Sequence, residues 1–169
     1  MIITGYQGIG KTTLANERYD IIDLESSSFW KVDKKGNRTR PDDWYVYYCQ
    51  IAQHLSKSGY QVFVSSHIEV REYLSTHNGE PFCAIFPSRS IKDEWIDRLY
   101  ERYKMSGSNK DLRALEHAKE YFDRDIDRFL YECSYGVEYY HNVYVIEDIN
   151  YQLEDIIEKI CYPTMKVTD

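Results

Sequence analysis

The stretch Gly5-Tyr6-Gln7-Gly8-Ile9-Gly10-Lys11-Thr12 decides the fold of this chain. It matches G-x-x-x-x-G-K-T, the pattern of a P-loop, in which glycines let backbone N–H groups turn toward a phosphate and the next helix adds its positive end. Lys11 is expected to reach the β- and γ-phosphates, and the Thr12 hydroxyl to bind Mg²⁺. The residues predicted to contact the nucleotide are Gly5, Gly8, Ile9, Gly10, Lys11, Thr12 and Thr13.

The segments on either side of this stretch support the prediction. Met1–Thr4 is a short apolar strand, and Thr13–Asn16 opens a helix. Strand, glycine-rich loop and helix follow one another in the order that the motif requires. The sequence therefore predicts a nucleoside triphosphate as ligand, with ATP expected and GTP as the alternative, together with Mg²⁺.

Length and composition narrow the class of protein. A chain of 169 residues suits one domain, 1–169, with a good core. The net charge of −7 argues against nucleic acid as the main partner, although a local basic groove stays open as an alternative. No apolar run approaches the ~20 residues of a membrane span, and no signal peptide is expected because a strand begins at the first residue. Four scattered cysteines indicate reduced thiols, so we expect a cytoplasmic protein that does not contact a membrane.

Four more apolar runs predict strands, namely Tyr19–Leu24, Gln61–Ser65, Phe82–Phe86 and Asn142–Ile146. They alternate with helical patterns, which favours a parallel sheet covered on both faces, a three-layer α/β/α fold. The last helix is expected to be capped by Asn150. Asn78, Gly136 and Pro163 are expected to mark the ends of other segments.

Polar residues follow the ends of several predicted strands, where ligands bind in open α/β sheets. Asp23 and Glu25 follow the second strand, and Ser65 follows the third. The third strand lacks the aspartate usual at its end, which shifts the metal and base roles toward Asp23. Arg71, on the next helix, is a candidate to bind the substrate.

Two further segments carry arginines. Lys31–Asp43 is polar and indicates a loop, in which Arg38 and Arg40 could meet an anionic substrate or lie solvated. Arg98 and Arg102 stand one helical turn apart, a spacing that suits a clamp on phosphate charge. The alternative is a surface ion-pair network with nearby glutamates.

At these residues the chain resembles the small P-loop kinases, which include nucleoside monophosphate, shikimate and gluconate kinases. The resemblance covers most of the chain in pattern, but only the P-loop is specific in sequence. It implies a strand order of 2-3-1-4-5 and a helical lid at about 88–109 that carries Arg98 and Arg102. It also implies phosphoryl transfer from MgATP, with Asp23 either orienting or deprotonating an acceptor hydroxyl or helping Thr12 to hold Mg²⁺. Candidates for the arginine that binds an acceptor phosphate are Arg38, Arg40, Arg71 and Arg89.

The sequence determines neither the identity of the acceptor nor the oligomeric state. The leading hypothesis is a phosphotransferase acting on a nucleotide or small hydroxylated metabolite. One alternative is a nucleotide-binding switch or structural protein with little turnover, which would need neither Asp23 nor the lid arginines. The other is a polynucleotide 5′-end kinase, against which the acidic balance of the chain argues.

Overall fold

A five-stranded parallel sheet forms the centre of the protein, whose computed structural model describes residues 1–77, 79–134 and 139–161. Every neighbouring pair in the sheet is parallel. The strands are β1 (Ile2–Gly5), β2 (Ile21–Asp23), β5 (Gln61–Val64), β6 (Phe82–Pro87) and β7 (Asn142–Ile146). The sequence therefore correctly predicted an α/β chain with a parallel sheet.

The strands lie in the order β2-β5-β1-β6-β7. These labels differ from the expected 2-3-1-4-5 because two short strands, β3 (Lys31–Val32) and β4 (Arg38–Thr39), were not predicted and pair only with each other. With that hairpin left out, the strands of the sheet, counted along the chain, stand second, third, first, fourth and fifth. The loop that follows β1 thus leaves the middle of the sheet.

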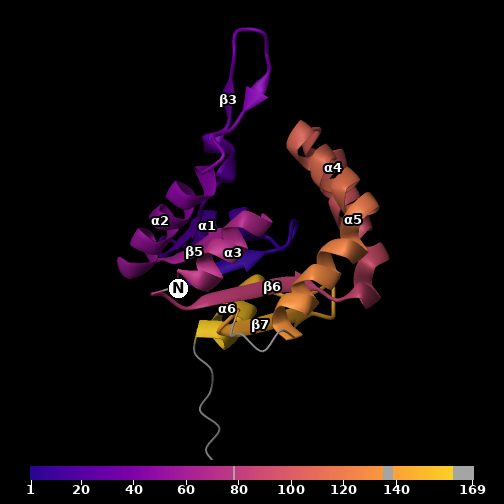
Figure 1. Ribbon diagram of the computed structural model, residues 1–169. Helices are drawn as coiled ribbons and strands as arrows, with labels where there is room; N and C mark the ends of the chain where they lie inside the picture. The colour runs from indigo at the N-terminus through magenta and orange to yellow at the C-terminus, as the bar shows by residue number, and fades with distance from the viewer. Residues whose placement is uncertain (78, 135–138, 162–169) are drawn as a thin grey trace, which may run out of the picture.

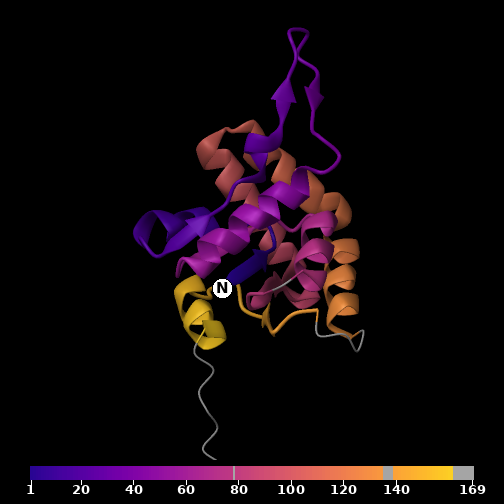
Figure 2. The same ribbon diagram turned by 60° about the vertical axis from the view of Figure 1, so that its left-hand side comes forward.

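The described residues form six α-helices. They are α1 (Lys11–Glu17), α2 (Trp44–Lys57), α3 (Ile68–Thr76), α4 (Lys92–Ser106), α5 (Asn109–Ser134) and α6 (Leu153–Cys161). Helix α1 packs on α6, whereas α2 packs on α3 and on strands β5 and β1. Figure 2 shows α6 on one side of the molecule and α3 with the last turns of α5 on the other, an arrangement compatible with three layers.

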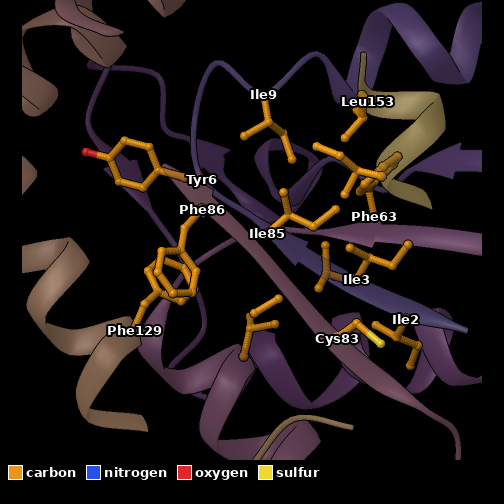
Figure 3. Packing of buried hydrophobic residues seen from close by; sticks show 14 of the residues in the cluster. Ile2, Ile3, Tyr6, Ile9, Phe63, Cys83, Ile85, Phe86, Phe129 and Leu153 are labelled. Atoms are coloured by element: carbon orange, nitrogen blue, oxygen red, sulfur yellow. The ribbon is translucent and has the colours of Figure 1, made fainter. Parts of the chain in front are cut away.

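The core lies on both faces of the central strands. All four residues of β1 and all six of β6 are buried, which explains why these strands read as continuous apolar runs. Figure 3 shows Phe86 of β6 against Phe129 of α5, whose rings stack with centroids 4.7 Å apart. Because Phe129 belongs to α5, this contact fixes the far end of that long helix to the sheet.

The segment 31–39 is a hairpin and not the plain loop that its polar composition indicated. Strands β3 and β4 pair antiparallel, and the Asp33 carboxylate accepts hydrogen bonds from the backbone N–H groups of Lys35 and Asn37. Asp and Asn side chains commonly form such local turns, so they can order a segment that has few apolar residues. Figure 1 shows this hairpin projecting away from the sheet.

The expected lid at about 88–109 is part of a larger helical arm, which we define as α4 and α5. Gly107 ends α4 in the left-handed conformation with φ of 59°, and α5 begins at Asn109 and packs along α4. In Figure 1 the arm projects from the sheet and α5 returns toward it. The predicted lid segment contains α4, and the Ser/Gly-rich break at its end is the tip of the arm.

Other predicted segment ends have mixed outcomes. Asn150 does not cap the last helix: it lies in a turn in which its backbone N–H donates to Asp148, and α6 begins at Leu153. Asn78, Gly136 and Pro163 lie outside the described residues. In the part of the chain that is described, no helix has the length and apolar character needed to cross a membrane.

Candidate functional site

The Gly5–Thr12 loop connects β1 to α1 and has little space around it. Gly8 has a φ of +91°, and a Cβ placed on it would lie 2.9 Å from Leu99 Cδ2 of α4. A Cβ on Gly5 would lie 2.2 Å from Ile9 Cδ1. The left-handed conformation of Gly8 favours glycine at this position, whereas the close contacts are with the ends of flexible side chains that can move aside.

Two aromatic side chains hold the backbone of this loop. Trp95 Nε1 of α4 donates to the Gln7 carbonyl at 3.0 Å, and the Tyr151 hydroxyl donates to the Ile9 carbonyl at 2.9 Å. The two rings also stack on each other, with centroids 6.0 Å apart and planes inclined by 6°. Because these bonds use carbonyl groups, they do not consume loop N–H groups that a phosphate would need.

Lys11 folds back over the loop. Its Nζ donates to the Gly5 carbonyl at 2.8 Å and lies 3.4 Å from the Tyr6 carbonyl. Burial lowers the pKa of Lys11 to about 8, although the carboxylates of Asp23 and Glu25 act in the opposite direction. An anion bound in the loop would favour the charged ammonium in the same way as these carboxylates.

Thr12 and Asp23 meet at the carboxyl end of the sheet. The Thr12 hydroxyl donates to Asp23 Oδ2 at 2.6 Å, although the two residues belong to different elements, α1 and β2. Strand β2 brings Asp23 there by pairing with β5, in a register that places it beside Phe63. A hydroxyl and a carboxylate in contact are oxygen donors of the kind that Mg²⁺ prefers.

A cavity of about 1130 Å³ opens beside these residues. Its walls are the loop, the ends of β2 and β5, the start of α3 and the inner face of the arm. Eight cationic and five acidic side chains line it, so the cavity is positive within a chain of net charge −7. A positive, partly enclosed site concentrates anions, and this volume exceeds what one ligand of ordinary size requires.

The two arginines of the predicted clamp both line the cavity but have partners in the protein. Arg98 is partly buried, and its Nη1 donates to the Ile149 carbonyl at 3.2 Å. Arg102 is exposed and pairs with Asp111 of α5 at 2.7 Å, not with a glutamate of its own helix. Burial works against the charged form of Asp111, but hydrogen bonds from Ser106 and Ser108 and the charge of Arg102 hold its pKa below the usual value.

The predicted substrate residues Glu25 and Ser65 also line the cavity. Glu25 forms an ion pair with Lys110, which links the end of β2 to the first turn of α5. The Tyr48 hydroxyl accepts from the Ser65 N–H at 2.8 Å and donates to the Leu24 carbonyl at 2.6 Å. Tyr48 therefore fixes the ends of β5 and β2 relative to each other.

Arg71 also borders the cavity but is used within the protein. It is 4% exposed, and its Nη2 lies 2.7 Å from Glu132, which itself accepts from the Tyr140 hydroxyl at 2.5 Å. Its Nη1 donates to the Ser66 carbonyl at 2.6 Å. Its Nε also donates to Glu132 Oε1 at 3.2 Å, so all three nitrogens of the guanidinium are engaged and α3 is tied to α5.

Arg40, another candidate for an acceptor phosphate, lies outside the cavity lining. Its guanidinium carbon lies 3.7 Å from the centre of the Trp44 ring and 4.5 Å from that of Trp30. Its Nη2 donates to the Ser26 carbonyl at 2.6 Å. This arginine fixes the base of the β3–β4 hairpin.

Sequence reasoning missed two groups of residues at the site. Trp95 and Tyr151, which hold the loop backbone, were not among the predicted site residues. Arg113, Arg124 and Arg128 were not among the predicted site residues, but all three line the cavity from one face of α5. The signal available was their spacing, because positions 113, 124 and 128 share one side of an α-helix.

No family model matches the sequence, and no curated protein matches it. Among solved structures, an uncharacterized protein from Eubacterium ventriosum ATCC 27560 is similar, with a TM-score of 0.47 and 16% sequence identity. The alignment covers 95% of this chain and 96% of that chain. The function is therefore inferred from the residues of the cavity.

Proposed function

We propose that this chain is an ATP-dependent phosphotransferase that uses the Gly5–Thr12 loop as a P-loop and the adjoining cavity as its acceptor site. The observation that carries the proposal is the 2.6 Å contact between Thr12 and Asp23 beside Lys11. This arrangement brings together the Lys11 ammonium, which can bind phosphate oxygens, the Thr12 hydroxyl, which can bind a metal ion, and the Asp23 carboxylate, which can bind a metal ion or accept a proton. Phosphoryl transfer needs mainly such positioning and charge neutralisation.

The chain's own residues would divide the work. Loop N–H groups and Lys11 would bind the β- and γ-phosphates, while Thr12 and Asp23 would hold Mg²⁺, which neutralises phosphate charge when bound. Two protein oxygens fit this ion, because Mg²⁺ usually keeps several waters and binds phosphates alongside one or two protein ligands. With a hydroxyl acceptor, its oxygen would form a bond to the γ-phosphorus, the bond to ADP would break, and Asp23 would receive or orient the proton.

The arm would enclose the transferring group. Arg98 and Arg102 line the cavity from α4, and Trp95 of the same helix holds the loop. Arg102 is held by a half-exposed ion pair with Asp111, a kind of pair that contributes at most ~1 kcal/mol. Exchange of Asp111 for a phosphate oxygen would let Arg102 contact the transferring phosphoryl group.

The test is ATP consumption with Mg²⁺ across separate pools of nucleoside monophosphates, nucleosides, sugar acids and 5′-hydroxyl oligonucleotides. Acceptor-dependent ADP formation that disappears in Lys11→Ala is the expected result. Tight ATP binding without acceptor-dependent turnover would instead support a nucleotide-binding switch, and GTP in place of ATP would identify the preferred donor.

A further inference from the structure

The charged side chains that line the cavity differ in whether they have hydrogen-bond or ion-pair partners within the protein. Its acidic side chains have partners: Asp23 contacts Thr12, Glu25 contacts Lys110, Asp111 contacts Arg102, Asp125 contacts Arg124 and Glu101 contacts Lys104. Most of its cations are engaged as well. Within the described ranges, Arg113 and Arg128 are the lining cations for which no hydrogen bond or ion pair is found.

These arginines belong to a basic stripe on α5, which we define as Lys110, Arg113, His117, Arg124 and Arg128. The intervals of three, four, seven and four residues keep them on one side of the helix, and the stripe spans about 27 Å. Near its start, α5 contacts the loop, because Gln7 Nε2 donates to the Ala114 carbonyl at 3.0 Å. Further along, α5 contacts α3, because Phe129 lies against Arg71.

The far end of the stripe has the character of an anion site. Arg124 and Arg128 are one helical turn apart, a spacing at which like charges repel and weaken a helix slightly. Arg124 pairs with Asp125 at 3.0 Å while its side chain is 62% exposed, so this pair is weak and exchangeable. Planar guanidinium groups form paired hydrogen bonds to phosphate or carboxylate oxygens, and the two charges of this pair match a phosphate monoester, which carries about −1.5 to −2 at pH 7.

The opposite wall is neutral. Ser65, Ser66 and His67 stand at the end of β5, and Ser65 Oγ lies 3.0 Å from His67 Nδ1. Burial lowers the pKa of His67, and the charges of Arg40 and Arg71 lower it further. This wall therefore offers neutral hydrogen-bonding groups to the uncharged part of a ligand, while α5 offers the charge.

We infer that the acceptor is a small molecule that carries a phosphate monoester, and that Arg124 and Arg128 bind this phosphate. The inference rests on the proposed function, since it names the class of acceptor for the same cavity. Nucleoside monophosphates and phosphorylated sugars or hydroxy acids share this chemistry. Neither arginine was among the residues that the sequence suggested for this role.

The test compares matched pairs of compounds on the wild-type protein, namely nucleosides against their 5′-monophosphates and sugars against their phosphates. Calorimetric titration measures binding of each compound without ATP, and ADP formation measures turnover with MgATP. We expect the phosphorylated member of at least one pair to bind and to stimulate turnover, while its neutral partner does neither. The active pair separates a nucleotide from a sugar phosphate.

The variants Arg128→Gln and Arg124→Gln should then raise the dissociation constant and the KM for that phosphorylated compound about 10- to 100-fold. The KM for ATP should change less than about 3-fold, because in the proposed function ATP binds to the Gly5–Thr12 loop and not to Arg124 or Arg128. Lys119→Gln is the control, because Lys119 is an exposed cation of α5 that does not line the cavity. Thermal unfolding of each variant checks that the fold is retained.

Several outcomes would overturn the inference while the proposed function stands: turnover stimulated equally by neutral compounds, turnover only with 5′-hydroxyl oligonucleotides, or unchanged affinity in Arg128→Gln. Absence of binding by every phosphorylated compound would also overturn it. Failure of the wild-type protein to bind ATP would instead remove the proposed function. The titrations without ATP would still decide whether the stripe binds phosphate.

Discussion

The two ends of the cavity are built in opposite ways. At the loop end, short side chains and backbone groups are held by Trp95, Tyr151 and the Thr12–Asp23 contact. At the α5 end, Arg124 and Arg128 are long, exposed side chains on the surface of a helix. The loop end is suited to one fixed chemical group, such as a triphosphate, whereas the α5 end can adjust to acceptors of different shape.

This difference predicts how each end responds to substitution. Changes at the loop end should affect every nucleotide-dependent property. Changes at the α5 end should affect only the acceptor. Arg71 lies between them, and its burial predicts a third behaviour in which stability and not binding is lost.

Lys11→Ala should have the largest effect, lowering ATP turnover about 1000-fold or more, because the cation beneath the phosphates is lost. The fold should persist, since Lys11 donates only to carbonyl groups of the loop. Steady-state ADP formation and thermal unfolding measure the two quantities, and Lys119→Ala is the matched control. Retained turnover in Lys11→Ala would show that the loop is not the active site.

Arg71→Met should lower the free energy of unfolding by about 3 kcal/mol, because Glu132 would stay buried without its cation. Urea unfolding measures this change. Arg128→Met, at an exposed position bordering the same cavity, should change it by less than about 0.5 kcal/mol. If the two variants had equal free energies of unfolding, Arg71 would not be needed for stability and would again be a candidate to bind the substrate.

Asp23→Asn should lower kcat about 100-fold while the dissociation constant of ATP changes less than about 3-fold. The amide keeps the size of the carboxylate and one oxygen acceptor for the Thr12 hydroxyl, but it cannot take up a proton. Single-turnover kinetics and calorimetry separate the two effects. If kcat fell and the dissociation constant of ATP rose by the same factor, Asp23 would be a binding residue and not a base.

Trp95→Phe should weaken ATP binding about 5-fold, which corresponds to about 1 kcal/mol for the lost hydrogen bond to the Gln7 carbonyl. Trp30→Phe, in an exposed residue before the hairpin, is the control and should leave ATP binding unchanged. Titration calorimetry compares the two. Unchanged affinity in Trp95→Phe would mean that the loop keeps its shape without this side chain.

The smallest expected effect is the uptake of a proton by Lys11 when ATP binds. Because the pKa of Lys11 is lowered to about 8, the free protein should lose this proton above that pH, and a bound triphosphate should restore it. ATP binding should then take up part of a proton at about pH 8 to 9 and weaken as the pH rises. Calorimetry in two buffers of different ionisation enthalpy measures the uptake. An observed enthalpy independent of the buffer would place Lys11 near its ordinary pKa.

The lowered pKa of Lys11 also makes the free energy of unfolding depend on pH. Its pKa is lower in the folded chain than in the unfolded chain, so between about pH 8 and 10.5 the unfolded state binds more protons. The contribution of Lys11 to the free energy of unfolding therefore rises with pH in this window. Below it, the buried charge costs stability.

The sequence by itself determined the parts of this protein that depend on neighbours along the chain. The glycines of the loop, the buried strands β1 and β6 and the position of Asp23 at a strand end follow from local patterns, because period, glycine content and apolar runs act over a few residues. The hairpin at 31–39 escaped prediction, since a side-chain turn centred on Asp33 orders it and its one apolar side chain, Val32, is exposed.

Only the tertiary structure decided which charged side chains share the cavity. Arg71 and Arg128 look alike in the sequence, yet one is buried against Glu132 and the other lines the cavity without a partner among the described residues. Glu132 lies 61 positions from Arg71, and only the packing of α5 on the sheet brings them together. Long-range packing fixes the burial of a charge, and burial separates an arginine that stabilises the fold from one available to a ligand.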